Sequence, residues 1–260
     1  MQAIGGLVTL GNLVLSLVLA MRLLRLSART QGPERWLGFY FLFAIFLGTI
    51  VVSVVYMSWA DPTLALPGDL GRVLHATGLA FSSFGFFGIL RFTQQVFRPQ
   101  SALARRSVSL GAVLLVASYV GVGATEGFAV HIVNGPAYWV GFAVRLGAMV
   151  WMASESLLYW SRQRRRLRLG LADPVLVNRF LLWGVWASSM ALTMLSDPGA
   201  RLYYWHVTGT TDTWLVAVGE PIIVAMIAVS SLLGVVSGTT LLLTFFPTAG
   251  YRRWIAARDH

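Results

Sequence analysis

The stretch AIGGLVTLGNLVLSLVLAMRLLR, residues 3–25, is an apolar run that ends in arginines. A helix that crosses the hydrocarbon core of a bilayer needs about 20 such residues. No basic segment precedes the run, and its arginines follow it, so the pattern favours a retained first helix over a cleaved signal peptide. This stretch therefore predicts a fold built inside a membrane.

Further apolar segments of similar length follow the first one. We expect transmembrane helices near residues 3–24, 36–60, 71–95, 107–125, 136–160, 176–196 and 215–246. A chain with 57% hydrophobic and only 12% charged residues cannot surround itself with a solvated polar surface. The expected fold class is all-α: a polytopic, seven-transmembrane helix bundle that forms one domain over residues 1–260.

The charged residues predict the orientation of this bundle. The chain has 20 arginines and no lysine, and all the arginines except Arg72, Arg145 and Arg201 fall on alternate connections or in the C-terminal tail. The positive-inside rule makes that side cytoplasmic. We therefore expect the N-terminus outside and the C-terminus inside, in a bacterial-type inner or plasma membrane, and no nucleic-acid partner despite the net charge of +10.

Two missing residue types exclude several chemistries. Without lysine the chain cannot form the Schiff base of a retinal pigment, and without cysteine it has neither disulfides nor thiolate metal sites. A haem in a helical bundle usually takes a second axial residue, and His75 has no matching intramembrane histidine. We expect no cofactor and no metal. An intramembrane serine protease would also need a histidine at the depth of its serine, and only His75 is conceivable.

Charges at membrane depth mark the predicted ligand site. A charge near the bilayer centre costs about 2.5–3.5 kcal/mol and persists only with a partner or a task. Arg145 lies about 14 Å below the outer end of its helix by the rise per residue. Glu220 is the acid expected to pair with it, with Glu126 or a loop carbonyl as the substitute. Such a pair is more often a structural pin than a ligand site.

Glu155 is the second deep charge, on the inner third of the fifth helix. Cytoplasmic arginines follow within one or two turns, so a structural role is expected. We predict that Glu155 reaches toward Arg162 or pairs with Arg179 or Arg91.

Small residues on one helix face predict close helix packing. They recur at spacings of three and four on the third and seventh helices: His75, Gly78, Ser82 and Gly85, then Ser230, Gly234 and Gly238. His75 could also offer a neutral imidazole to a pocket. The seventh helix, at 32 residues, is expected to tilt, protrude, or break at Pro221 or at Ser237–Gly238.

An aromatic segment is expected between the sixth and seventh helices. The residues from Asp197 to Thr213 include Tyr204 and Trp205 and are predicted to form an outer loop. Such a loop either lies on the bilayer as an interfacial hairpin or covers an extracellular ligand site.

The end of the chain carries a resemblance to a known class of protein. The seventh helix closes on Phe245-Phe246-Pro247, and Tyr251-Arg252-Arg253-Trp254 follow. This layout resembles the seven-helix sensor domains that precede output modules in bacterial signalling proteins. No output module follows His260, so the resemblance implies a stand-alone sensor or a membrane subunit coupled to a partner.

The expected function is that of a non-catalytic, receptor-like membrane protein. Its ligand pocket is predicted in the outer half, between the third, fifth, sixth and seventh helices. There Arg145 would orient an anionic or carbonyl-bearing small molecule, with Glu220 as counter-ion and His75, Tyr204 and Trp205 nearby. We expect contact with membrane lipids and a protein partner at the cytoplasmic face or within the membrane.

The alternative is a structural, channel or transporter subunit of a larger membrane assembly. In that case the aromatic side chains of the third helix would face a neighbouring chain, a bound lipid or a pigment. These side chains are Phe81, Phe84, Phe86 and Phe87.

Overall fold

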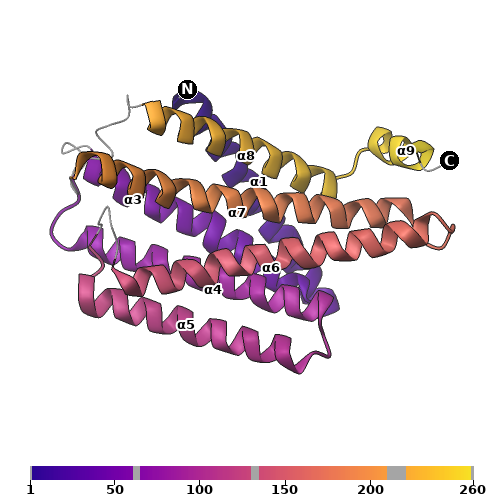
Figure 1. Cartoon of the computed structure of the whole chain (residues 1–260), viewed down its shortest axis with the longest axis horizontal. Helices are drawn as coiled ribbons and strands as arrows, with labels where there is room; N and C mark the ends of the chain where they lie inside the picture. The colour runs from indigo at the N-terminus through magenta and orange to yellow at the C-terminus, as the bar shows by residue number, and fades with distance from the viewer. Residues whose placement is uncertain (1, 61–64, 130–134, 210–220, 259–260) are drawn as a thin grey trace.

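The computed structural model describes residues 2–60, 65–129, 135–209 and 221–258, and all regular structure within them is helical (Figure 1). The all-α fold class is confirmed. The elements are α1 (Gln2–Thr30), α2 (Glu34–Phe39), the π-helix η1 (Tyr40–Gly48), α3 (Thr49–Ala60), α4 (Leu70–Phe97), α5 (Ala102–Glu126), α6 (Pro136–Leu167), α7 (Pro174–Thr208), α8 (Pro221–Phe245) and α9 (Ala249–Arg258).

Six helical stretches in the described residues are long and apolar enough to cross a bilayer. They are Gly6–Thr30, Glu34–Val55, Leu70–Phe97, Ala102–Glu126, Pro174–Ser196 and Val224–Phe245. The long helix α6 is not among them, and it carries the charged residues Arg145 and Glu155. These stretches indicate an integral membrane protein.

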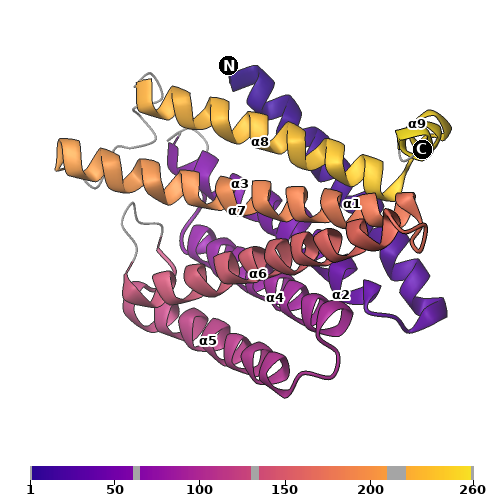
Figure 2. The same ribbon diagram turned by 45° about the vertical axis from the view of Figure 1, so that its right-hand side comes forward.

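The helices close into a ring around one core. Going round it, α1 packs on α2 and η1, η1 on α4, α4 on α5 and α6, α6 on α7, α7 on α8, and α8 back on α1. The two termini lie at opposite ends of the bundle (Figure 2). The α4–α5 and α6–α7 connections and α9 gather at the same end (Figure 1). The arginine-rich segments of these connections therefore share one end.

Aromatic rings fill the centre of the ring of helices. Tyr40 and Phe41, both fully buried, contact Trp186 of α7 with ring centroids 5.8 Å and 5.5 Å apart. Tyr40 also meets Phe86 of α4 edge to face, at 5.3 Å. Burying such large rings and pairing them edge to face ties η1, α4 and α7 together.

Glycines on α4 let it approach α2, η1 and α3 closely, as the small-residue pattern predicted. A methyl group added at Gly85 would lie 2.5 Å from Cβ of Ala44, and one at Gly78 would lie 2.8 Å from Val52. At Gly88 the same methyl would meet the carbonyl oxygen of Trp36 at 2.5 Å. Only glycine permits these approaches, so the predicted packing face of α4 is confirmed.

The helices extend further than the apolar segments do. Helix α1 continues to Thr30 and α6 to Leu167, both through arginine-rich sequence. Arginine favours helix, and these turns project beyond the apolar part of each helix. The outer loop predicted from Asp197 to Thr213 is wrong as far as Thr208, because α7 runs through Pro198 and ends at Thr208, with Gly209 as its C-cap. Residues 210–213 of that prediction lie outside the described part of the chain.

The last transmembrane segment also differs from its prediction. Helix α8 begins at Pro221 and continues through Ser237 and Gly238, so of the predicted options, tilt, protrusion or a break, the break at Ser237–Gly238 does not occur. Proline suits the first turn of a helix because its missing N–H has no partner there anyway. After Pro247 the chain forms α9, in a tail for which no helix was predicted.

Candidate functional site

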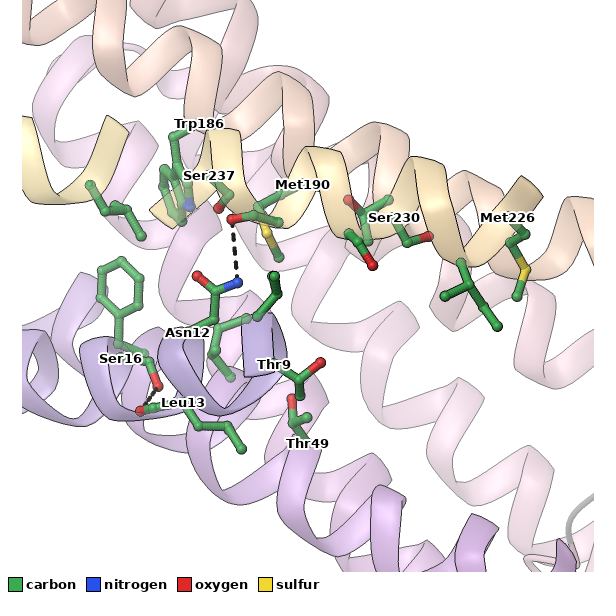
Figure 3. Close-up of a pocket in the computed structure, with 18 residues that line it drawn as sticks. Thr9, Asn12, Leu13, Ser16, Thr49, Trp186, Met190, Met226, Ser230 and Ser237 are labelled. Atoms are coloured by element: carbon green, nitrogen blue, oxygen red, sulfur yellow. Dashed lines mark hydrogen bonds between the residues drawn. The ribbon is translucent and has the colours of Figure 1, made fainter. Parts of the chain in front are cut away.

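A cavity of about 510 Å³ lies between α1, η1, the start of α3, α7 and α8 (Figure 3). Its apolar walls include Phe41, Trp186, Met190 and Met226. Its polar side chains are uncharged: Thr9, Asn12, Ser16, Thr49, Thr193, Ser230, Ser231 and Ser237. The volume falls in the range typical of small-molecule sites.

The cavity-lining side chains of α8 all lie on one face of that helix. On α8 the lining residues Ser230, Gly234, Ser237 and Leu241 recur at spacings of four, three and four, which is one helix face. From Met226 to Leu241 this face is about 22 Å long by the rise per residue. The cavity is therefore a narrow, elongated space that follows α8.

The wall opposite α8 owes its alignment to the π-helix. Phe41, Ile45 and Thr49 all line the cavity at spacings of four. A π-helix has a wider turn than an α-helix, so this spacing keeps the three side chains more nearly in line. π-Helical segments occur frequently at functional sites.

Asn12 joins the first and last transmembrane helices beside the cavity. Its Nδ2 donates a hydrogen bond to the carbonyl oxygen of Gly234, at 3.3 Å (Figure 3). A methyl group at Gly234 would lie 2.9 Å from Val8, and one at Gly238 would lie 2.9 Å from Oδ1 of Asn12. The small-residue face of α8 is therefore a close-packing face, as predicted, and α1 is what it packs against.

Several hydroxyls of the lining are already used inside the protein. Ser16 donates to the carbonyl of Leu13 at 2.7 Å, and Ser230 shares a hydrogen bond of 2.9 Å with Ser196. Ser237 is buried and lines the cavity; its carbonyl accepts a hydrogen bond from Thr240, but its side-chain hydroxyl makes none within the described residues. Its hydroxyl is available to a bound molecule.

No Arg, Asp, Glu or His lines this cavity among the described residues. A charged ligand there would lose its hydration without gaining an opposite charge. Hydroxyl, amide, thioether and aromatic groups suit an uncharged molecule that carries hydrogen-bonding groups.

Comparison with known proteins finds no relative of this chain. No protein-family model, curated protein or solved structure matches the chain. The resemblance to bacterial sensor domains therefore stays a prediction.

Arg145 is buried in α6, as expected, but it does not line the cavity. Its guanidinium carbon lies 5.5 Å from the centre of the Tyr138 ring, a cation–π contact. Glu220, its predicted partner, lies outside the described residues. The substitute Glu126 instead accepts a hydrogen bond from the backbone N–H of Gly135, at 2.9 Å.

His75 and Trp205, two other predicted ligand residues, do not line this cavity either. His75 is buried, and its Nδ1 lies 2.8 Å from the carbonyl oxygen of Phe128, so it ties α4 to the end of α5. Trp205 is 45% exposed on the last turns of α7. Tyr204 belongs to the same helix, and its side chain lies outside the described part.

Glu155 has a different partner from the one predicted. Its Oε1 accepts hydrogen bonds from Nε of Arg98 at 2.8 Å and from Nε1 of Trp151 at 3.3 Å. Arg179 is exposed on the first turns of α7 and is not the partner. Arg98 follows the last residue of α4, where its side chain reaches across to α6, and this bond raises the pKa of Arg98.

The aromatic residues of α4 divide between the interior and the surface. Phe86 is buried against Tyr40, so it does not face a neighbouring chain as the alternative prediction required. Phe84 is 43% exposed beside a groove between α4 and α5.

Sequence reasoning missed Asn12, Trp186 and Ser237. Asn12 and Ser16 lie four residues apart in the apolar first part of α1, and that spacing was a signal for a polar face. The packing of α8 against α1 forms the cavity. No local sequence pattern predicts this packing, because it joins the two ends of the chain.

Proposed function

We propose that this chain is a non-catalytic, receptor-like protein that crosses a bacterial-type inner or plasma membrane seven times. The N-terminus is outside and the C-terminus is cytoplasmic. The ligand is an uncharged small molecule held in the cavity between α1, η1, α7 and α8.

Seven crossings are supported by the placement of the charges on α6. Arg145 is buried within the bundle, and Glu155 is paired with Arg98, so neither charge stands unpartnered against lipid. Counting α6 with the six apolar stretches gives an odd number of crossings, which agrees with termini at opposite ends of the bundle (Figure 2). The arginine-rich end is then cytoplasmic.

The cavity carries the proposed function. Its length along α8 and its uncharged polar lining suit an elongated, neutral, amphipathic molecule that accepts or donates hydrogen bonds. The buried hydroxyl of Ser237 offers such a bond. Among the described lining residues no titratable side chain is present to act as general acid or base, which supports binding rather than catalysis.

Native mass spectrometry of protein released from its own membrane in gentle detergent tests this function. We expect a stoichiometric small molecule on the wild-type protein and its loss from Ser231→Leu, which fills the cavity. Ser83→Leu, placed in the α4–α5 groove, is the matched control and should keep the ligand. Wild-type protein that carries no small molecule, or a Ser231→Leu variant that folds and keeps it, overturns the proposal.

One observation favours the rival function of a subunit in a larger assembly. The groove of about 360 Å³ between α4 and α5 is lined by Phe84, Phe87, Leu115 and Tyr119, among others, and its exposed aromatic edge suits a neighbouring helix. A bare higher oligomer or co-purified subunits in the same spectrum, lost in Ser83→Leu, would support that function instead.

A further inference from the structure

A second, outward-facing groove runs along the seam where α1 and α8 meet. It has a volume of about 520 Å³ and an apolar lining that includes Val14 and Leu242, each about half exposed. Gly11 forms part of its floor, and a methyl group there would meet nothing within 4 Å. The groove therefore has room for a chain of methylene groups.

At Val18 this seam groove joins a cationic one on the same helix. The second groove, of about 480 Å³, is lined by Val18, Met21, Arg22, Arg25, Leu26 and Arg29. These residues recur at spacings of three and four, so an apolar stripe on α1 passes directly into a row of arginines. Val18 lines both grooves, so the two grooves are adjacent along α1.

The first of the three arginines holds the end of α8 in place. Nη1 of Arg22 donates a hydrogen bond to the carbonyl of Phe245 at 2.8 Å, and its guanidinium lies 4.7 Å from the centre of the Phe246 ring. Arg25 and Arg29 are exposed, and no acidic side chain in the described residues pairs with either. Two neighbouring guanidinium groups are thus available at the end of an apolar groove.

We propose that the α1–α8 seam binds one anionic phospholipid. An acyl chain occupies the seam groove, and the headgroup phosphate is held between Arg25 and Arg29. Guanidinium groups bind phosphate through paired hydrogen bonds, and arginines at a membrane surface attract anionic lipids. The seam groove shares Val8, Asn12 and Gly234 with the proposed ligand cavity, but the headgroup site at Arg25 and Arg29 shares no lining residue with it.

Charge favours a lipid over a second copy of this chain. The described acids with a printed partner are engaged at helix ends, as Glu126 and Asp173 are, or paired with arginine, as Glu155 is. Asp69 is paired with Arg72, and Glu34 has a buried carboxylate oxygen. The described acids of a second copy would therefore bring no unpaired acidic helix face to Arg25 and Arg29. A phospholipid brings both the negative charge and the apolar chain.

Lipid retention from nanodiscs tests the site. The protein is reconstituted in nanodiscs with equal amounts of phosphatidylglycerol and phosphatidylcholine, and native mass spectrometry counts the lipids it keeps. Neutralising two arginines that contact the bound headgroup lowers the preference for the anionic lipid by up to about thirtyfold. We expect this fall in Arg25→Gln/Arg29→Gln but not in Arg105→Gln/Arg106→Gln, which removes two exposed arginines from α5 instead.

A second variant tests the groove without changing charge. Gly11→Leu fills the seam and should reduce retention of both lipids while the protein keeps its thermal unfolding midpoint. An equal loss in the α5 control, displacement of the lipid by inorganic phosphate alone, or a dimer in place of bound lipid would each overturn the proposal. The same spectra show whether the small molecule is bound in the cavity. Loss of the lipid proposal and loss of the ligand proposal can therefore be told apart.

Discussion

Glu155 on α6 and Arg98 beyond the end of α4 form an ion pair in which Nε of Arg98 lies 2.8 Å from Oε1 of Glu155. The carboxylate is largely shielded, with 12% of its side chain exposed, while the arginine side chain is 45% exposed. Trp151 donates to the same oxygen. The pair therefore fixes the α4 end against α6 at the arginine-rich end of the bundle.

Removing either partner should lower stability, and removing both should cost little more than removing one. Arg98→Gln leaves a shielded carboxylate without its cation, which is the unfavourable case for a paired charge. A double-mutant cycle with Glu155→Gln, read by thermal unfolding in detergent, measures the coupling. Arg179→Gln is the control and should leave the midpoint unchanged. A strictly additive cycle would contradict the pairing.

Tyr251 should make the docking of α9 depend on pH. Burial raises the pKa of Tyr251 above its ordinary value of 10.0, although a hydrogen bond donated by Asn178 opposes the shift. A raised pKa in the docked state means that this stabilisation is complete below pH 10.0 and is lost as the pH rises through the raised value.

Trp254 provides the readout, since its ring stacks on Tyr251 with centroids 6.1 Å apart. We expect tryptophan fluorescence to fall above pH 10.0 in the wild type, and Tyr251→Phe to lack that transition. A wild-type transition centred below that pH would show that the folded state does not protect the protonated hydroxyl.

Gly88→Ala should destabilise the bundle by about 1–3 kcal/mol. Its methyl group would lie 2.5 Å from the backbone carbonyl of Trp36, which cannot rotate away as a side chain can. Gly147→Ala on α6 is the matched control, because a methyl there meets nothing within 4 Å and alanine favours helix. Thermal unfolding of the two variants should move in opposite directions, or only Gly88→Ala should move.

Thr93→Val should leave stability unchanged or raise it by about 1 kcal/mol. The hydroxyl of Thr93 is fully buried and has no hydrogen-bond partner within the described residues, so valine keeps the shape and removes the unpaired polar group. Thr240→Val is the contrast, because that hydroxyl donates to the carbonyls of Val236 and Ser237 at 2.9 Å. A larger loss of stability in Thr93→Val than in Thr240→Val would contradict this reasoning.

The sequence predicted what depends on local patterns. Apolar length located the helices, and the glycine spacing of α4 and α8 predicted their close-packing faces. The sequence did not predict contacts that depend on which helices become neighbours. Arg98 rather than Arg179 meets Glu155 because α4 ends beside α6, and no spacing rule contains that information.

Two further differences have the same physical origin. The polar segment from Asp197 to Thr208 has the composition of a loop, yet it continues α7, since one proline removes a single hydrogen bond and the rest of the helix remains. The cavity formed around Asn12 instead of Arg145, because it depends on which helices become neighbours when the ring closes.

The contact between Asn12 and Gly234 joins residues 222 positions apart. During synthesis the segment with Asn12 is made long before the segment with Gly234. Until the later segment is made, the polar amide of Asn12 has no carbonyl of α8 to bind, and the cavity lacks its longest wall. The nascent chain therefore cannot bind its ligand in this cavity until α8 has been made. A chain truncated before α8 should insert into the membrane but bind nothing in this cavity.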